Sequence, residues 1–266
     1  NFDLLLLENV SRPAICQPDN KPKLLVQAYS NALLHQARVN SEIVALDADL
    51  VLDTGLLPFK KEFPERFIEC GIAEQDMVSR AGTMALNNLL PVVHSFSCFL
   101  TSRPNEQIYN NSTELTKIIY VGSLAGVVPG GPGHSHQAVR DISSLSSIPN
   151  LFIIEPSCEE EIKLLFDWCV NVNQTSSYLR LVSIPTTKRF NLKKNYEVIK
   201  GQGVSIRDGK DALIITYGPI LLSNSMEAVD ILEDKFGLTI RIINLPWLNY
   251  IDENWLIYEM KDFNYV

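Results

Sequence analysis

Arg66-Phe-Ile-Glu-Cys-Gly-Ile-Ala-Glu-Gln-Asp-Met77 is the most informative segment of this 266-residue chain. An apolar run ends at Ile68, Gly71 interrupts it, and a helical pattern begins at Ala73. Glu74 therefore lies where a predicted strand gives way to a helix, at the carboxyl edge of a sheet, and open α/β sheets bind ligands at that edge. A carboxylate there can also simply stabilise the helix dipole, and from position alone this structural role is the simpler interpretation.

The composition is that of a soluble globular protein. Hydrophobic residues make up 46% and charged residues 20%, and the net charge is −8. No basic run favours nucleic acid, and no apolar run approaches the length of a membrane span. The cysteine count is odd and contains no CxxC pair, which favours reduced thiols in a cytoplasmic protein over disulfides or a zinc site. The cysteines are Cys16, Cys70, Cys98, Cys158 and Cys169.

Predicted strands alternate with predicted helices through most of the chain. Apolar periodicity indicates helices at 24–39, 73–87, 99–110, 136–145 and from 157, and strands at 42–46, 91–96, 117–121, 151–154 and 178–182. This alternation predicts an α/β fold, with a mostly parallel sheet flanked by helices on both faces.

Changes in composition divide the chain into four parts. Residues 1–22 contain three prolines and are predicted to form a linker or an N-terminal arm, and 23–185 form the first domain. Residues 186–210 are basic and irregular, as expected of a linker. Residues 211–266 start a second α/β domain, with strands at 212–217 and 238–244 and helices at 221–236 and 253–261. Two strands and two helices cannot cover both faces of a parallel sheet, so we expect this domain to be truncated.

Four motifs carry a family resemblance. They are Asp47-Ala-Asp-Leu50, the segment from Arg66 to Gln75, Ser95-Phe-Ser-Cys-Phe-Leu100 and Gly133-His-Ser-His-Gln137. In order and spacing they resemble the pyrimidine-binding domain of transketolases and deoxyxylulose-phosphate synthases. Residues after Lys210 resemble the start of the transketolase C-terminal domain. The resemblance therefore implies the thiamin-diphosphate pyrimidine-binding fold over 23–185, followed by an incomplete C-terminal domain.

The resemblance implies thiamin diphosphate (TPP) chemistry, with Glu74 as a catalytic residue. In this family the matching carboxylate hydrogen-bonds N1′ of the cofactor's aminopyrimidine and thereby promotes loss of the thiazolium C2 proton. The cofactor then serves as electron sink while a carbon–carbon bond breaks. A carboxyl that shares a proton with a ring nitrogen should be shielded from water, so we expect Glu74 to be buried.

Four further residues match cofactor-binding positions of the family. Phe96 and Phe99 match the aromatic pair that lines the pyrimidine pocket, with Phe99 stacking on the ring. Without the other motifs, two phenylalanines at this spacing would be interpreted as plain core. Asp49 and Leu50 match positions that approach the thiazolium, although Asp49 alone would be interpreted as a turn residue.

The loop motif supplies the predicted substrate contacts. His136 matches a family histidine that contacts the bound sugar, and we predict a catalytic role for it. His134, Gln137 and Arg103 are predicted substrate-binding residues, and Arg180 fits a binding or a structural role. His134 and His136 have no carboxylate or cysteine at ligand spacing, so we predict no metal ligand in this chain.

Four positions depart from the family pattern. Family residues that grip the sugar phosphate, an aspartate, a histidine, an arginine and a serine, are replaced here by Pro132, Leu124, Leu181 and Asp53. Proline, leucine and aspartate cannot form the usual anion clamp. We therefore do not expect the usual pentose phosphates to be handled in the usual manner.

The family's Gly-Asp-Gly motif for the diphosphate is missing from the sequence. The nearest run is Arg207-Asp-Gly-Lys210, in the predicted linker. We therefore expect a diphosphate-binding transketolase N-terminal subunit or domain to hold the diphosphate and its Mg2+ (or Ca2+). Because the family's cofactor lies between the two kinds of domain, we expect an oligomer: a homodimer of two halves, or a heterotetramer if the halves are separate polypeptides.

Three functions follow as hypotheses. The first is a two-component transketolase-like transferase that moves a two-carbon ketol unit from a ketose to an aldehyde, with sugar or sugar-phosphate substrates. The second is a 2-oxo acid-using synthase or a dehydrogenase E1 β-type subunit. The third is a degenerate regulatory subunit. Gln75 and the Ser-His-Gln137 triplet favour the first hypothesis over the second, and the intact Glu74 and phenylalanine pair argue against the third.

Overall fold

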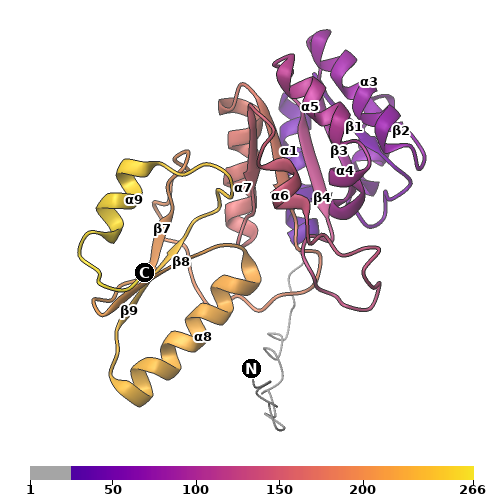
Figure 1. The fold of residues 1–266 in the computed structure, drawn as a ribbon. Helices are drawn as coiled ribbons and strands as arrows, with labels where there is room; N and C mark the ends of the chain where they lie inside the picture. Colours follow the sequence, from indigo (N-terminus) through magenta and orange to yellow (C-terminus); the bar gives the residue numbers. More distant parts are fainter. Residues whose placement is uncertain (1–24) are drawn as a thin grey trace, which may run out of the picture.

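Six parallel strands form the larger of two sheets, in the order β2-β1-β3-β4-β6-β5. Figure 1 labels the first four of these strands. The computed structural model describes residues 25–266, so the predicted arm at 1–22 lies outside the described residues. The parallel sheet with helices on both faces confirms the predicted fold class. The strands are β1 Ile43–Asp47, β2 Phe67–Glu69, β3 Leu90–Phe96, β4 Ile119–Ser123, β5 Leu151–Ile154 and β6 Ser176–Arg180.

Both faces of this sheet are covered by helices. One face packs against α1 Leu25–Val39 and α7 Glu159–Asp167, and the other against α3 Glu74–Leu86, α4 Ser97–Ser102 and α5 Asn105–Thr113. Strands β1 and β4 are buried at every position, as expected for a parallel sheet between two helical layers. Burial on both sides also explains their nearly continuous apolar sequence.

Two predicted helices were wrong in their extent. The helix expected at 99–110 is divided into α4 and α5 at Pro104, because proline has no N–H to donate to the preceding turn. The helix expected at 136–145 begins only at Asp141, as α6 Asp141–Leu145. Its first residues instead form a turn, with the His136 N–H donating to the Gly133 carbonyl at 3.1 Å.

Three further details differ from the sequence interpretation. The loop expected between the first two motifs contains α2 Leu57–Glu62 and the 3-10 turn Pro64–Arg66. At the start of α7, Ser157 donates its N–H and its hydroxyl to Glu161, whereas the spacing Ser157-x-x-Glu160 predicts Glu160 as its partner. The third difference lies in the predicted linker at 186–210, where Val204–Arg207 forms strand β7.

The second unit contains a three-stranded sheet. β7 runs antiparallel to β9 Ile240–Asn244, which pairs in parallel with β8 Ala212–Thr216. Helix α8 Pro219–Phe236 packs on this sheet, and α9 Glu253–Met260 follows it. The strand in the predicted linker had a weak signal because β7 has four residues and gains its backbone bonds from β9, which lies far along the chain.

The second unit joins the first along strand β5. The Glu155 N–H donates to the Pro246 carbonyl and the Leu248 N–H to the Ile153 carbonyl, both at 2.9 Å. Trp247 between them is 1% exposed and belongs to the core of the first unit. Within residues 25–266, none of the helices is both long and apolar enough to cross a membrane.

Candidate active site

The predicted site residues lie at the carboxyl ends of the parallel strands. Phe96 is the last residue of β3, and Glu74 is the first residue of α3, which follows β2. The loop that follows β4 projects from the same edge (Figure 1) and carries His136. Parallel topology therefore brings these three motifs together although they are distant in sequence, and the fourth, Asp47–Leu50, follows β1 at the same edge.

Glu74 is a buried carboxylate at the start of a helix. Only 4% of its surface is exposed, which confirms the expected burial. Its Oε1 forms an ion pair with Nη1 of Arg103, whose side chain is 40% exposed. The amide of Gln75 donates to the Arg103 carbonyl at 3.2 Å. A buried carboxylate requires such a partner, and here the partner can leave towards solvent.

Three rings form an aromatic cluster beside Glu74. The Phe96 and Phe99 centroids are 5.9 Å apart, and the His136 ring meets Phe99 at 5.2 Å and Phe96 at 6.1 Å in edge-on geometry. The guanidinium of Arg103 lies over Phe99, with its central carbon 4.0 Å from the ring centroid. Arg103 therefore covers the ring and holds the carboxylate at the same time.

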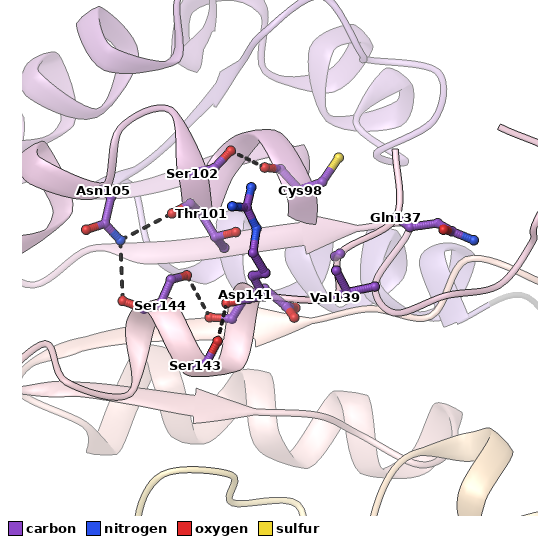
Figure 2. A pocket seen from close by; sticks show the side chains of 11 residues that line it. Cys98, Thr101, Ser102, Asn105, Gln137, Val139, Asp141, Ser143 and Ser144 are labelled. Carbon is purple, nitrogen blue, oxygen red and sulfur yellow. Dashed lines mark hydrogen bonds between the residues drawn. The ribbon is translucent and has the colours of Figure 1, made fainter. Parts of the chain in front are cut away.

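The two other predicted residues of this loop, Gln137 and His134, lie outside the aromatic cluster. Gln137 donates its amide to the Val127 carbonyl at 2.9 Å, and His134 is exposed. Gln137 and Cys98 also line a cavity of about 340 Å³ between α4 and α6. Figure 2 shows these two side chains at one end of the cavity and Asn105 at the other.

Asp49 and Leu50 lie in the turn that follows β1. Asp49 is exposed and has a left-handed backbone with φ 61°, and Leu50 is half-buried. Their backbone is held by Asp47 and Glu69, two residues that the sequence interpretation did not select. The available signal was Asp47 itself, an acidic residue inside an otherwise apolar strand.

Arg180 belongs to a buried charge cluster. Its Nε donates to Asp141 at 2.6 Å and its Nη1 to Glu155, and its side chain is 8% exposed. Tyr178 donates its hydroxyl to the same Asp141 oxygen at 3.1 Å. Burial raises the pKa of Glu155, while the charge of Arg180 opposes that increase. Of the two roles that the sequence left open for Arg180, this geometry supports the structural one.

The four positions that depart from the family pattern differ in exposure and backbone conformation. Leu181 is fully buried, Leu124 has a left-handed backbone with φ 55°, and Pro132 and Asp53 are exposed. Across the described part of the chain, no group of three or more His, Cys, Asp or Glu side chains is placed to hold a metal ion.

The fold and the site define an α/β protein with a carboxylate–aromatic site at the carboxyl edge of its sheet. Family profiles described as "Transketolase, pyrimidine binding domain" and "Transketolase, C-terminal domain" match residues 22–183 and 201–262. The chain therefore belongs to the transketolase family.

Curated relatives include 1-deoxy-D-xylulose-5-phosphate synthases. The chain is 33% identical over 241 residues to that of Clostridium botulinum and 32% identical over 243 residues to that of Clostridium acetobutylicum. The alignments cover 90% and 89% of this chain but 38% of each relative. The chain thus spans well under half the length of these relatives.

Solved structures show the same fold. A structure described as "Split gene transketolase, inactive beta4 tetramer" has a TM-score of 0.79 at 26% identity, covering 91% of this chain and 78% of the other. Transketolase from Leishmania mexicana has a TM-score of 0.77 at 19% identity, covering 94% of this chain and 40% of the other.

Proposed function

We propose that this chain supplies the pyrimidine-binding half of a TPP-dependent transketolase-like enzyme. The observation that carries the proposal is a buried carboxylate, Glu74, beside an aromatic ring, Phe99, at the carboxyl edge of a parallel sheet. These residues fit an aminopyrimidine, because the ring offers a flat apolar face and the carboxylate is shielded from water.

Each residue would hold a different part of the cofactor. Glu74 would hold a proton at N1′, Phe99 would stack on the pyrimidine with Phe96 beside it, and Asp49 and Leu50 would approach the thiazolium. When bound, TPP supplies an electron sink for breaking the bond beside a carbonyl group. The protein residues would orient the bound cofactor and exclude water from the Glu74 carboxylate.

Arg103 must move when a pyrimidine binds. Its guanidinium lies on the face of Phe99 and against the Glu74 carboxylate, so it covers the position that the pyrimidine would take. Its partial exposure leaves it room to turn outwards. Once displaced, Arg103 would face the substrate side, consistent with the substrate contact predicted for it.

The loop residues would contact the sugar. His136 lies against both phenylalanines, and its Nδ1 is 2.9 Å from the Ser135 hydroxyl, which fixes the orientation of the ring. We assign it to the substrate as a donor or acceptor of protons. His134 and Gln137 lie in the same loop and would extend this contact.

A second polypeptide or domain would complete the site. Leu52, Ile72 and Val127 lie on loops around the site and are 74%, 72% and 56% exposed, an apolar surface that suits a protein partner. That partner would hold the diphosphate and its Mg2+ or Ca2+. We propose a homodimer of two such halves, or a heterotetramer if the halves are separate chains. The similar split-gene transketolase is described as inactive in its beta4 form, and we expect this chain to be inactive alone.

The proposed reaction is transfer of a two-carbon ketol unit from a ketose to an aldehyde, with sugars or sugar phosphates as substrates. Gln75 and the Ser135–Gln137 triplet support this reaction. A second candidate is a 2-oxo acid-using synthase, which the identity with the 1-deoxy-D-xylulose-5-phosphate synthases favours. Four described cysteines, Cys70, Cys98, Cys158 and Cys169, are free, which agrees with a reducing, cytoplasmic location.

The test combines the chain with its diphosphate-binding partner, TPP and Mg2+, and screens ketose and 2-oxo acid donors. Ketol transfer without release of carbon dioxide supports the first candidate, and release of carbon dioxide supports the second. Glu74→Ala should abolish turnover while the fold remains intact. The control is Asp76→Ala, because Asp76 is exposed on the same helix and pairs with Arg80. Full activity of Glu74→Ala would refute the assignment.

A further inference from the structure

Two carboxylates on neighbouring strands lie directly under the proposed cofactor contacts. Asp47 ends β1 and Glu69 ends β2, and the parallel register places them opposite each other. The turn carrying Asp49 and Leu50 follows the first strand, and the turn that leads to Glu74 follows the second. Each carboxylate therefore lies within a few residues of a segment that is proposed to bind the cofactor.

Asp47 holds the first turn from within the core. It is fully buried, and its Oδ2 accepts the Leu50 N–H at 2.6 Å while its Oδ1 accepts the Thr54 hydroxyl at 3.0 Å. The same hydroxyl lies 2.9 Å from the Leu50 carbonyl oxygen. The Leu50 amide is thus fixed by the Asp47 carboxylate, and the Leu50 carbonyl accepts the Asp53 and Thr54 N–H groups at 2.9 Å.

Glu69 joins the two turns through a single atom. Its Oε1 accepts the Asp49 N–H at 2.9 Å and the Gly71 N–H at 3.0 Å. Both residues have left-handed backbones, with φ of 61° and 66°, a conformation that is costly for Asp49 because it carries a Cβ. The carboxylate therefore supports a strained turn on one side and the approach to Glu74 on the other.

We propose that Asp47 and Glu69 are positioning residues that set the geometry between the Asp49–Leu50 turn and Glu74. The inference rests on the proposed function, because these two segments would contact opposite ends of the same cofactor. Without the two carboxylates, the thiazolium side and the pyrimidine side of the site would no longer be held at a fixed separation. Pre-organisation of this kind lowers the cost of ordering a site on binding.

The hydrogen bond from the Leu50 N–H to Asp47 does not require a negative charge on Asp47. Burial, with the charges of Glu69 and Asp49, raises the pKa of Asp47 to about 6, while the hydrogen bonds from Leu50 and Thr54 oppose the increase. Its neighbour on β3 is His94, whose ring bonds the Leu46 carbonyl and the Tyr29 hydroxyl. A protonated carboxyl, or an asparagine amide, can still accept from Leu50 while donating to Thr54.

The first arm of the test measures hydrogen exchange of the amides in the isolated chain. We expect Asp47→Ala to speed exchange of the Leu50 amide, and Glu69→Ala that of the Asp49 and Gly71 amides, by about tenfold or more. Asp47→Asn and Glu69→Gln should keep wild-type protection because they retain an acceptor. Glu65→Ala, which removes an exposed carboxylate from the 3-10 turn before β2, is the control. Unchanged protection in both alanine variants would overturn the proposal.

The second arm measures TPP affinity in the complex with the diphosphate-binding partner and Mg2+. We expect the alanine variants to raise the dissociation constant of TPP about tenfold or more, and the Asn and Gln variants to restore it. Wild-type affinity in both alanine variants would refute the positioning role. If the wild-type complex binds no TPP, the proposed function fails instead, and the exchange arm still decides whether these carboxylates hold the turns.

Discussion

Asp47→Asn should make the protein more stable at neutral pH, even though it changes a residue beneath the proposed site. Burial raises the pKa of Asp47 from 3.8 to about 6, so between these pH values the folded protein binds a proton that the unfolded chain does not bind. Wild-type stability therefore falls as the pH rises through this interval. The difference of about 2.2 pH units, at 1.36 kcal/mol each, corresponds to about 3 kcal/mol.

An asparagine keeps the hydrogen bonds but never becomes charged. The free energy of unfolding of Asp47→Asn minus that of the wild type should therefore increase by up to about 3 kcal/mol between pH 4 and pH 8, and level off above about pH 7. Urea denaturation of both proteins at five pH values measures this difference. Asp76→Asn, which removes an exposed carboxylate paired with Arg80, should give a small and flat difference. A pH-independent difference for Asp47→Asn would refute the argument from burial.

Three other perturbations test separate parts of the structure. Arg103→Ala should strengthen TPP binding in the assembled complex, because no guanidinium then has to leave Glu74. Titration of the complex with TPP measures this affinity. Weaker binding by the variant would contradict the prediction and show that Arg103 stabilises the bound state. Gly218→Ala should destabilise the protein by about 2 kcal/mol or more. The new Cβ would lie 2.0 Å from a Glu155 oxygen, and the backbone of Gly218 has φ 68°. An unchanged melting temperature of the variant would contradict this prediction. Burial lowers the pKa of His94 to about 4, so stability should decline as the pH falls from about 6.5 towards 4, and a His94→Gln variant should lack that part of the decline in pH-dependent denaturation.

The sequence was sufficient to predict the parallel sheet and to group Phe96, Phe99 and His136 with Glu74 as site residues. Alternating apolar patterns are local signals, and parallel topology then brings the carboxyl ends of the strands together without further information. Phe96 and Phe99 were predicted as a pair and His136 as a residue of another motif, and the structure places the three rings in one cluster. Their roles towards a cofactor or substrate stay predictions.

Other features depend on contacts that no local pattern records. Strand β7 exists because β9 pairs with it. No helix forms before Asp141 because His136 closes a turn on Gly133 and Ala138 bridges to Ala125 and Gly126. The position of Arg103 over Phe99 requires α4 to end where Pro104 forces it to end. The roles of Asp47 and Glu69 depend on the register of two strands that are distant in sequence, which no local pattern records.

The attachment of the second unit along β5 also protects the larger sheet. A strand at the edge of a sheet presents unpaired N–H and C=O groups, which another chain can add to. Here the backbone of residues 246–248 accepts from Glu155 and donates to Ile153, and Asn249 bonds the backbone of Leu151 and Ile153 through its side chain. The opposite edge, β2, is three residues long and offers little for pairing. The C-terminal unit thus covers one edge of the sheet and reduces the backbone that another chain could pair with there.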